Sequence, residues 1–235
     1  MLLVDHELIS LVEQVRGEGQ PPLLDPFVDH KVRGDFPSYG LQSAGYDLRL
    51  NPVVGLRVFK AERICIPLSP LEPERQTKST WIEKPISRKL VLLPGFLALG
   101  SSLEHFNMPS NVLGLCHGKS TYSRLGLIMN VTPIEPGWRG FLTIEMFNHN
   151  PNPVEILVEG GILQVTFHLL SSVPKALYSG AYQDQKAEVV PARVGGSKEM
   201  SEMDELQIGA GTSQMSERRY GPRKTWTLTE LKKEG

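Results

Sequence analysis

Short apolar segments separated by proline, glycine and asparagine make up the chain from about residue 23 to residue 191. They are YDLRL (46–50), RICIPL (63–68), LVLLPGFLALG (90–100), VLGLCH (112–117), FLTIEMFN (141–148), VEILV (154–158) and ILQVTFHLL (162–170). Apolar runs of this length between turn-forming residues are typical of β-strands joined by tight turns. The pattern predicts a mainly β fold, namely a sandwich, a jelly roll or a barrel. Within it, Pro94 and Gly95 predict the turn of a β-hairpin.

One short helix is predicted at the start of the chain, where apolar residues recur at helical spacing. Asp5 precedes this run as a predicted N-cap, and two glycines mark its end. The residues of the run and its end are Leu8, Leu11, Val12, Val15, Gly17 and Gly19. Helical periodicity is nearly absent after them, so few other helices are expected.

A change of composition after Arg193 predicts a domain boundary. Residues 1–193 are expected to form one β domain, and residues 194–235 a mobile C-terminal extension with one docking element near Trp226 and Leu228. The extension carries seven Lys or Arg and seven Asp or Glu residues but few core-forming ones, a composition typical of segments that do not pack. The alternative interpretation is an unstructured extension that has no function.

Charge and cysteine use narrow the class of protein. The formal net charge of −1 over 235 residues gives no general attraction to nucleic acid or to an anionic membrane, so neither is expected as a partner. Asp5, His6 and Glu7 interrupt the apolar N-terminus, which argues against a signal peptide or a membrane span and favours a cytoplasmic location. Cys65 and Cys116 are far apart and form no CxxC pair, so both are interpreted as buried apolar residues.

Glu145 is a candidate catalytic residue because of its place in the segment FLTIEMFN. Strand alternation places it on one face together with Phe141, Thr143 and Phe147. A carboxylate among apolar neighbours loses hydration, which raises its pKa towards the range used for proton transfer near neutral pH. An edge strand whose polar face lies in water explains the same pattern.

The segment CHGKSTYSRLG (116–126) ends like the phosphate-binding loop of P-loop NTPases, but its spacing differs. That motif requires a glycine five residues before Gly118, where this chain has Leu113. The segment still concentrates hydroxyl and basic side chains, which can bind the oxygens and the charge of a polyphosphate. These side chains belong to Lys119, Ser120, Thr121, Ser123 and Arg124. A solvated polar turn is the alternative interpretation.

Two further segments are candidates for the wall of a binding site. TPIEPGWRG (132–140) leads directly into the Glu145 strand, and such loops on β scaffolds often line sites. Its Glu135 and Arg139 are either site residues or a surface ion pair. YSGAYQDQKAE (178–188) either closes over a base or a triphosphate, or covers the edge of the core. Its aromatic and amide residues are Tyr178, Tyr182, Gln183 and Gln185.

The histidines argue against one class of deaminase. The chain has six histidines, and they form no HxE or HxxxH pair. Zinc-dependent nucleobase deaminases need HxE together with PCxxC. A zinc centre of that class is therefore not expected.

The segment GKSTYSRLGLIMNVTPIEPGWRGFLTIEMFN (118–148) closely resembles the central motif of the dCTP deaminases, members of the deoxyuridine triphosphatase-like superfamily. The resemblance extends to YGLQSAGYDLRL (39–50) upstream, and to GGILQVTFHL (160–169) and AYQDQKAEVVP (181–191) downstream. It spans roughly residues 1–193, and the combination of motifs is specific.

The resemblance implies a distorted β-barrel or jelly roll of the deoxyuridine triphosphatase kind. It implies a homotrimer with active sites at the subunit interfaces. The implied reaction is the hydrolysis of dCTP to dUTP and ammonia without zinc, which supplies dUTP for dUMP and thymidylate synthesis. Magnesium is expected to accompany the triphosphate of the substrate rather than to bind a set of protein ligands.

By the same resemblance, the general base and acid of the family corresponds to Glu145, and its supporting serine and arginine to Ser120 and Arg124. Arg124 would orient Glu145, and Ser120 would hold the attacking water or the tetrahedral centre. The triphosphate-binding loop corresponds to residues 119–124 and the base-recognising strand to residues 143–145. The predicted nucleotide-binding residues are Lys119, Ser120, Thr121, Tyr122, Ser123, Arg124, Glu135, Thr143, Ile144, Glu145, Gln164, Tyr178 and Gln185.

Two alternatives to a dCTP deaminase stay open on the sequence. A dUTP diphosphatase, or a bifunctional enzyme, would use an acidic residue in the loop before the strand to activate water, and Glu135 has that position. A catalytically silent nucleotide-sensing module is the alternative of another class.

The chain also departs from the pattern of many relatives in two places. They carry lysine at the position of Ala181, and their loop after Tyr178 is longer. One phosphate contact is therefore expected to be lost or supplied from elsewhere.

Overall fold

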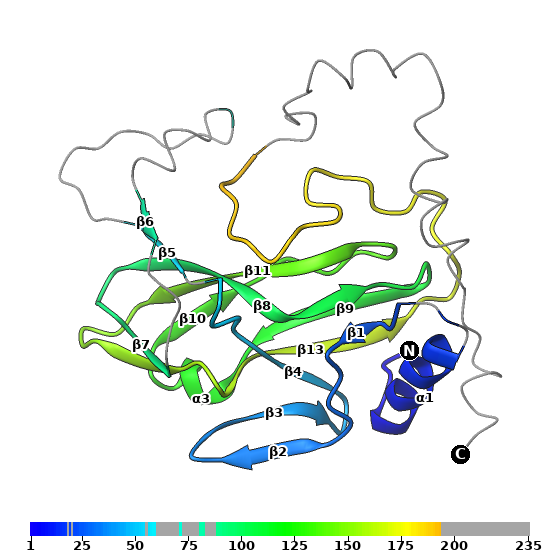
Figure 1. Ribbon diagram of the computed structural model, residues 1–235, viewed down its shortest axis with the longest axis horizontal. Coiled ribbons are helices and arrows are strands. Elements are labelled where there is room, and N and C mark those ends of the chain that lie inside the picture. The colour runs from blue at the N-terminus through cyan, green and yellow to red at the C-terminus, as the bar shows by residue number, and fades with distance from the viewer. Residues whose placement is uncertain are drawn as a thin grey trace.

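The protein is described by a computed structural model at residues 1–17, 19, 21–54, 56–59, 71, 80–82 and 88–193. Over these residues the chain is mainly β, as predicted (Figure 1). The elements in chain order are α1 (Asp5–Gly17), β1 (Leu24–Asp25), β2 (Lys31–Gly34), β3 (Phe36–Gln42), β4 (Gly45–Arg49), β5 (Arg57–Phe59), β6 (Thr80–Ile82), β7 (Lys89–Leu92), β8 (Leu97–Asn107), β9 (Val112–Gly118), α3 (Ser120–Ser123), β10 (Leu127–Asn130), β11 (Arg139–Asn148), β12 (Val154–Leu157) and β13 (Gly161–Leu169). The strand predicted at 63–68 and the predicted extension 194–235 lie outside the described residues.

Two large antiparallel sheets enclose one hydrophobic core. The first has the strand order β10-β11-β8-β5-β6, with β1 paired to one end of β8, and the second has the order β2-β3-β4-β13-β9. Fully buried side chains from both sheets belong to the same core cluster, including Tyr46 and Phe167 from the second sheet and Ile144 and Met146 from the first. The strands β7 and β12 form a separate antiparallel pair. This arrangement confirms the mainly β fold class.

The β-hairpin predicted around Pro94 and Gly95 is wrong, although the turn itself forms. The N–H of Phe96 donates to the carbonyl oxygen of Leu93 at 3.2 Å, and Gly95 has a φ of 75°. The strands on either side pair elsewhere, β7 with β12 and β8 with β11 and β5. Turn residues therefore identified the turn, whereas packing across the whole domain decided which strands pair.

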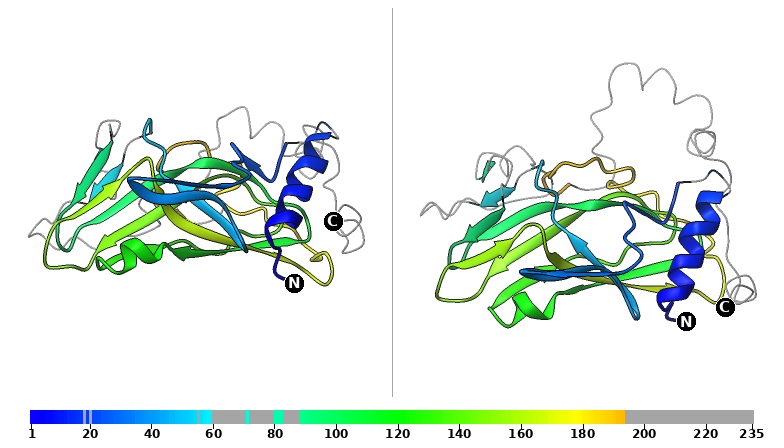
Figure 2. Two further views of the ribbon diagram at one scale, coloured as in Figure 1. Left: turned by 90° about the horizontal axis from the view of Figure 1, so that it is seen from below. Right: turned by 60° about the horizontal axis from the view of Figure 1, so that its bottom comes forward.

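Helix α1 forms where it was predicted and lies across one end of the sheets (Figure 2). Its buried apolar residues are Leu8, Leu11 and Val12. The N-cap predicted at Asp5 is wrong, because Asp5 lies inside the first turn and the Glu7 carboxylate accepts the N–H of Val4 at 3.0 Å instead. Across the described part of the chain, no helix is both long enough and apolar enough to traverse a bilayer.

Cys116 lies on β9 and packs partly buried against the core. Burial raises the pKa of its thiol to about 12. It is therefore a neutral thiol near pH 7, in line with its interpretation as a small apolar residue. Cys65, the other cysteine, lies outside the described residues.

Candidate functional site

A cavity of about 350 Å³ lies between β11 and the segment 178–192, which follows the last strand. Figure 1 shows this segment, in yellow to orange, passing over β11. Most of the cavity wall is apolar and includes Leu99, Trp138 and Leu142. The predicted site residues in its lining are Glu135, Thr143, Glu145, Tyr178 and Gln185. One cavity thus gathers residues that lie up to 50 positions apart in the sequence.

Strand alternation along β11 presents Glu145 to this cavity. Ile144 and Met146 are fully buried in the core, whereas Glu145 is half-buried on the opposite face. The edge-strand alternative is wrong, because β11 lies between β10 and β8. Asn130 on β10 and Leu99 on β8 are the residues directly opposite Glu145. The carboxylate therefore has one apolar and one amide neighbour on its own face of the sheet.

Two opposing effects act on the pKa of Glu145. Burial disfavours the charged carboxylate and raises its pKa, as predicted from the sequence. The Nδ2 amide of Asn130 donates a hydrogen bond of 2.7 Å to Oε2 and so favours the charged form. The net direction is upward, which brings the carboxyl closer to the range in which it can both accept and return protons near neutral pH.

Gln185 attaches the segment 178–193 to β11. Its Nε2 donates to the carbonyl oxygen of Phe141 at 2.9 Å and to Oγ1 of Thr143 at 2.8 Å. The backbone carbonyl oxygen of Gln185 accepts the backbone N–H of Phe141 at 3.0 Å. Two predicted nucleotide-binding residues, Thr143 and Gln185, are therefore bonded to each other at the cavity wall.

Two more contacts fix this segment at the start of β11. Arg139 forms a bidentate ion pair with Asp184, with Nε and Nη2 at 2.7 and 2.9 Å from the two carboxylate oxygens. The Arg139 side chain is 8% exposed and that of Asp184 is 56% exposed, so a buried guanidinium anchors a carboxylate that lies at the surface. The indole N–H of Trp138 donates to the carbonyl oxygen of Tyr182 at 2.8 Å.

Gly140 of β11 lies against the backbone of Gln185 in the attached segment, and we expect Gly140→Ala to destabilise the protein. Gly140 has a φ of 137°, and a Cβ there would lie 2.7 Å from the backbone nitrogen of Gln185. Backbone on both sides would have to shift, so the free energy of unfolding should fall by about 1–3 kcal/mol. Denaturant unfolding measures the loss. Gly95→Ala is the matched control, because Gly95 has a φ of 75° but no atoms within 4 Å of the added Cβ; an equal loss in both variants would contradict the steric explanation.

The polar segment 119–124 does not line the cavity of its own chain. It follows β9 in the second sheet, and its residues Ser120–Ser123 form the short helix α3. The ammonium of Lys119 forms an ion pair with Asp47 on β4 and lies 3.4 Å from Oγ of Ser38. Burial raises the pKa of the Asp47 carboxyl, and the Lys119 charge opposes that rise. Lys119 is thus held against the second sheet.

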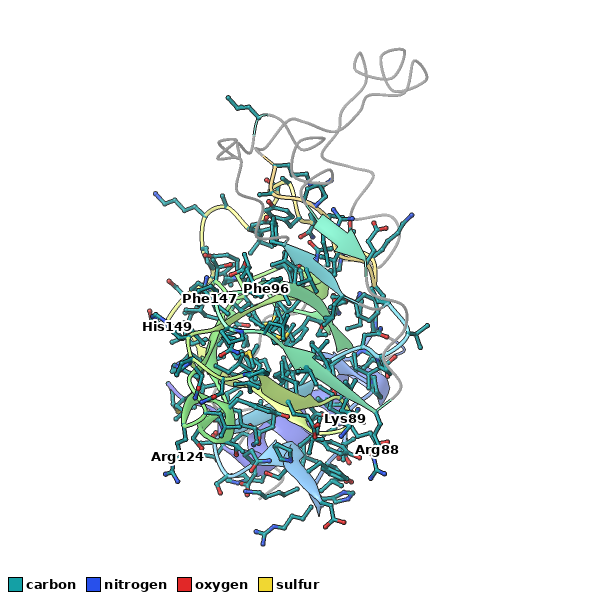
Figure 3. The ribbon with its side chains drawn as sticks, turned by 90° about the vertical axis from the view of Figure 1, so that its left-hand side faces the viewer. Arg88, Lys89, Phe96, Arg124, Phe147 and His149 are labelled. Carbon is teal, nitrogen blue, oxygen red and sulfur yellow. The ribbon has the colours of Figure 1, made fainter. Side chains whose placement is uncertain are left out.

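The other predicted residues are buried in the core, paired within the second sheet or exposed. The Tyr122 side chain is buried, and its hydroxyl accepts the N–H of Leu157 at 2.9 Å. Gln164 lies on β13 directly opposite Asp47. The exposed residues of the segment are Ser120, Thr121, Ser123 and Arg124, and Figure 3 shows Arg124 projecting from the edge of the molecule. One chain therefore carries a cavity group around Glu145 and a separate loop group at 119–124.

Sequence reasoning missed Asn130 as a neighbour of Glu145. Nothing in the residue type indicates this contact, which depends on the register of β10 against β11. Residues 131–138 separate the two strands, and a connection of that length does not fix the register as a tight turn does, so no local signal predicted the contact. Among the residues that the structure describes, no group of three or more His, Cys, Asp or Glu side chains could hold a metal ion. The expectation of a zinc-free reaction stays a prediction.

Comparison with known proteins assigns the chain to a family. A family model described as dCTP deaminase-like matches residues 27–170. The chain belongs to the dCTP deaminase-like family. The matched region contains β10, β11, Glu145 and the segment 119–124. The resemblance identified from the sequence motifs is thereby confirmed.

Relatives of this dCTP deaminase-like chain are found in several bacteria. A dCTP deaminase of Chlamydia felis is 40% identical over 201 residues, which cover 81% of this chain and 99% of the relative. A dCTP deaminase of Herpetosiphon aurantiacus is 38% identical over 172 residues, covering 72% of this chain and 90% of the relative. A crystal structure of the 2'-deoxycytidine 5'-triphosphate deaminase from Agrobacterium tumefaciens has a TM-score of 0.47 and 20% identity, covering 72% of this chain and 48% of that chain. The relatives support the prediction that the protein is an enzyme.

Proposed function

We propose that this dCTP deaminase-like protein hydrolyses dCTP to dUTP and ammonia, with Glu145 as the group that accepts and returns protons. The observation that carries the proposal is the half-buried Glu145 carboxylate in the wall of a largely apolar cavity. The names of the curated relatives support the same substrate. The dUTP formed would feed the supply of dUMP for thymidylate synthesis.

The proposed reaction adds water to C4 of cytosine. Glu145 takes a proton from the water as its oxygen bonds to C4, and returns that proton to N3. In the tetrahedral intermediate, the proton of the new hydroxyl passes through Glu145 to the amino nitrogen. The C4–N bond then breaks, ammonia leaves, and C4 becomes the carbonyl of uracil. One carboxylate serves both transfers, and Glu145 regains its charge at the end.

Selectivity for cytosine is proposed to come from the backbone of residues 143–145, whose donors and acceptors would pair with the edge of the base. The hydrogen bonds of Gln185 to Phe141 and Thr143 hold this part of β11 in place. A base that leaves a buried partner unpaired loses about 1–3 kcal/mol of binding. That loss is enough to separate cytosine from uracil by a useful factor.

The triphosphate is proposed to bind the loop group 119–124 of a neighbouring subunit, as the resemblance implies for a homotrimer. Two features support a shared site. The loop group does not reach the Glu145 cavity in its own chain, and exposed apolar side chains lie on β10 and just before it. Leu125 and Ile128 are 45% and 48% exposed, and Ile128 is directly opposite the half-buried Phe147 of β11. Figure 3 shows Phe147 and His149 together at this edge, above Arg124.

The proposed roles of Ser120 and Arg124 follow from this shared arrangement. Ser120 would bind the water or the tetrahedral centre, and Arg124 would face the Glu145 of the neighbouring subunit. Both side chains are exposed and thus available to a neighbour. Magnesium belongs to the substrate, because it would arrive bound to the triphosphate oxygens.

A dUTP diphosphatase activity, alone or as a second step, is the second candidate. Glu135 lines the same cavity as Glu145, so a second carboxylate is available near the bound nucleotide. It would activate water for attack on the α-phosphate. This activity would release pyrophosphate and dUMP.

Product analysis tests the proposal. The purified protein is incubated with dCTP and magnesium in the presence of a zinc-selective chelator, and ammonia, dUTP, dUMP and pyrophosphate are measured. Ammonia and dUTP in equal amounts are expected. Ammonia with dUMP and pyrophosphate would establish the bifunctional enzyme. Binding of dCTP without any turnover would overturn the proposal in favour of a nucleotide-sensing module.

A further inference from the structure

Asn130 is the residue of β10 that lies directly opposite Glu145. In an antiparallel pair such residues project from the same face of the sheet, with their side chains within contact distance. The Nδ2 atom of Asn130 is 2.7 Å from Oε2 of Glu145. The contact is therefore built into the strand register and does not depend on a loop.

The chemistry of the pair decides which end of the amide faces Glu145. An ionised carboxylate accepts hydrogen bonds and donates none, so the amide nitrogen of Asn130 must face it. Among the residues that the structure describes, this is the one hydrogen bond that the Glu145 carboxylate accepts. Its two oxygens are consequently different: Oε2 is bonded to Asn130, whereas Oε1 has no hydrogen-bond partner in the described part of the chain.

The other neighbours of Glu145 do not duplicate this contact. Leu99 on β8 is apolar and directly opposite on the other side, and Arg57 on β5 follows one strand further along the same row. From the loop before β11, the carboxylate of Glu135 lines the cavity and would repel rather than bind Glu145. From the segment above, the side-chain Nε2 of Gln185 is already used by Phe141 and Thr143.

Two phenols are the other titratable side chains of the cavity wall. Tyr178 and Tyr182 line the cavity from the segment above it. Both belong to a segment that is attached to β11 at Gln185, whereas Asn130 belongs to the paired strand itself. The position of Asn130 relative to Glu145 is thus set by strand pairing and not by that segment.

We propose, on the basis of the deaminase function proposed above, that Asn130 is the positioning residue of the catalytic carboxylate. Its amide fixes Oε2 and leaves Oε1 as the oxygen that exchanges protons with water, N3 and the leaving amine. A hydrogen bond to one oxygen disfavours the rotation that would exchange the two oxygens, so the same atom mostly collects and returns the proton. The distance between that atom and C4 is then set by two paired strands.

The hydrogen bond also affects the pH range in which Glu145 is a base. A donor to the charged form lowers the pKa of a carboxyl, in opposition to the burial that raises it. Removal of the donor therefore raises the pKa further, and the base form is lost at a higher pH as the solution is acidified. An orienting role thus has a signature in the pH profile that a merely structural role lacks.

Asn130→Ala and Asn130→Asp test the proposal. In Asn130→Ala, kcat at pH 7 should fall about tenfold, with little change in KM, and the acidic limb of the kcat profile should move to higher pH. Asn130→Asp keeps the shape of the side chain but places a second carboxylate against Glu145. The two carboxyls then titrate as a coupled pair, so the acidic limb should move to a still higher pH. Asn152→Ala is the matched control, because that exposed asparagine lies in the turn after β11 and its side-chain amide contacts Asn150.

A second readout separates this proposal from the deaminase function. The carboxyl of Glu145 is followed by carbon-13 NMR in labelled protein without substrate, and its signal is identified by its absence in Glu145→Gln. The titration of this signal should move to higher pH in Asn130→Ala and further in Asn130→Asp. An unmoved titration would overturn the positioning role, even in an active enzyme. If the titration moves but the protein does not turn over dCTP, the positioning role of Asn130 stands and the proposed deaminase function is overturned.

Discussion

Glu145→Gln should lower kcat for dCTP deamination by about 10²–10⁴-fold and leave dCTP binding largely intact. The amide has the shape of the carboxylate and can still accept the hydrogen bond of Asn130, but it cannot take a proton from water. Binding should persist because the cavity wall and the backbone of β11 are unchanged. Ammonia release measures the rate, and calorimetry with dCTP measures the binding.

Glu155→Gln is the matched control for this variant. Glu155 lies on β12, and its carboxylate is 2.8 Å from the Lys89 ammonium in an exposed ion pair. Such pairs contribute little to stability, so this variant should be as active as the unchanged protein. Unchanged turnover in Glu145→Gln would remove Glu145 from the mechanism. Lost dCTP binding in Glu145→Gln would instead make it a residue that holds the substrate.

The pH dependence gives a further check on the same carboxylate. Its pKa is raised by burial, and the active form is the ionised base. Activity should therefore be complete above the raised pKa and fall as the pH decreases through it. The fall should begin at a higher pH than the ordinary pKa of a glutamate would give. A profile without an acidic limb in this range would contradict the assignment.

The part of this fold that sequence could predict is the part that depends on local pattern. The alternation of FLTIEMFN correctly placed Ile144 in the core and Glu145 on the other face, because a strand buried on one side allows only one phase. Helix α1 was likewise found from its spacing. Strand partners were not predictable in the same way: the turn at Pro94 and Gly95 connects strands of different sheets, which no local signal distinguishes from a hairpin.

The same division holds for the site. The cavity group was predictable as a set of candidates, since Glu145 and the residues before it form motifs in the sequence. Closure by the segment 178–188 was one of two alternatives from the sequence, but its attachment to β11 was not predictable, because the bidentate pair of Arg139 and Asp184 joins positions 45 residues apart. The contact of Asn130 with Glu145 needed the register of two strands. For both the fold and the site, contacts between residues far apart in the sequence could not be predicted from local patterns.

Mixing two inactive variants should restore activity if the site is shared between subunits as proposed. Glu145→Gln lacks the proton acceptor, and Arg124→Ala lacks the arginine of the loop group. In randomly mixed oligomers, a site built from two neighbouring chains receives both intact groups in about a quarter of cases. Deaminase activity should thus rise from nearly none to about a quarter of the unmixed wild-type level.

The two variants are unfolded together, refolded together and assayed for ammonia, with each variant refolded alone as the reference. A pair of variants within one chain's cavity is the control: Glu145→Gln mixed with Asn130→Ala should give no more than the average of the two, because both residues lie on the same paired strands. Absence of rescue in the first mixture, with mixed oligomers demonstrated by two affinity tags, would mean that Arg124 and Glu145 do not meet across an interface.

Rescue in that mixture would also explain the arrangement of the single chain. The loop group 119–124 follows a strand of the second sheet and presents exposed hydroxyl and guanidinium groups, while the cavity presents a largely apolar wall with the Glu145 carboxylate in it. Neither half holds both the charge for a triphosphate and the base for the reaction. Deamination would then require assembly, and a variant that dissociates the oligomer should lose activity to the same extent as Glu145→Gln while each chain stays folded.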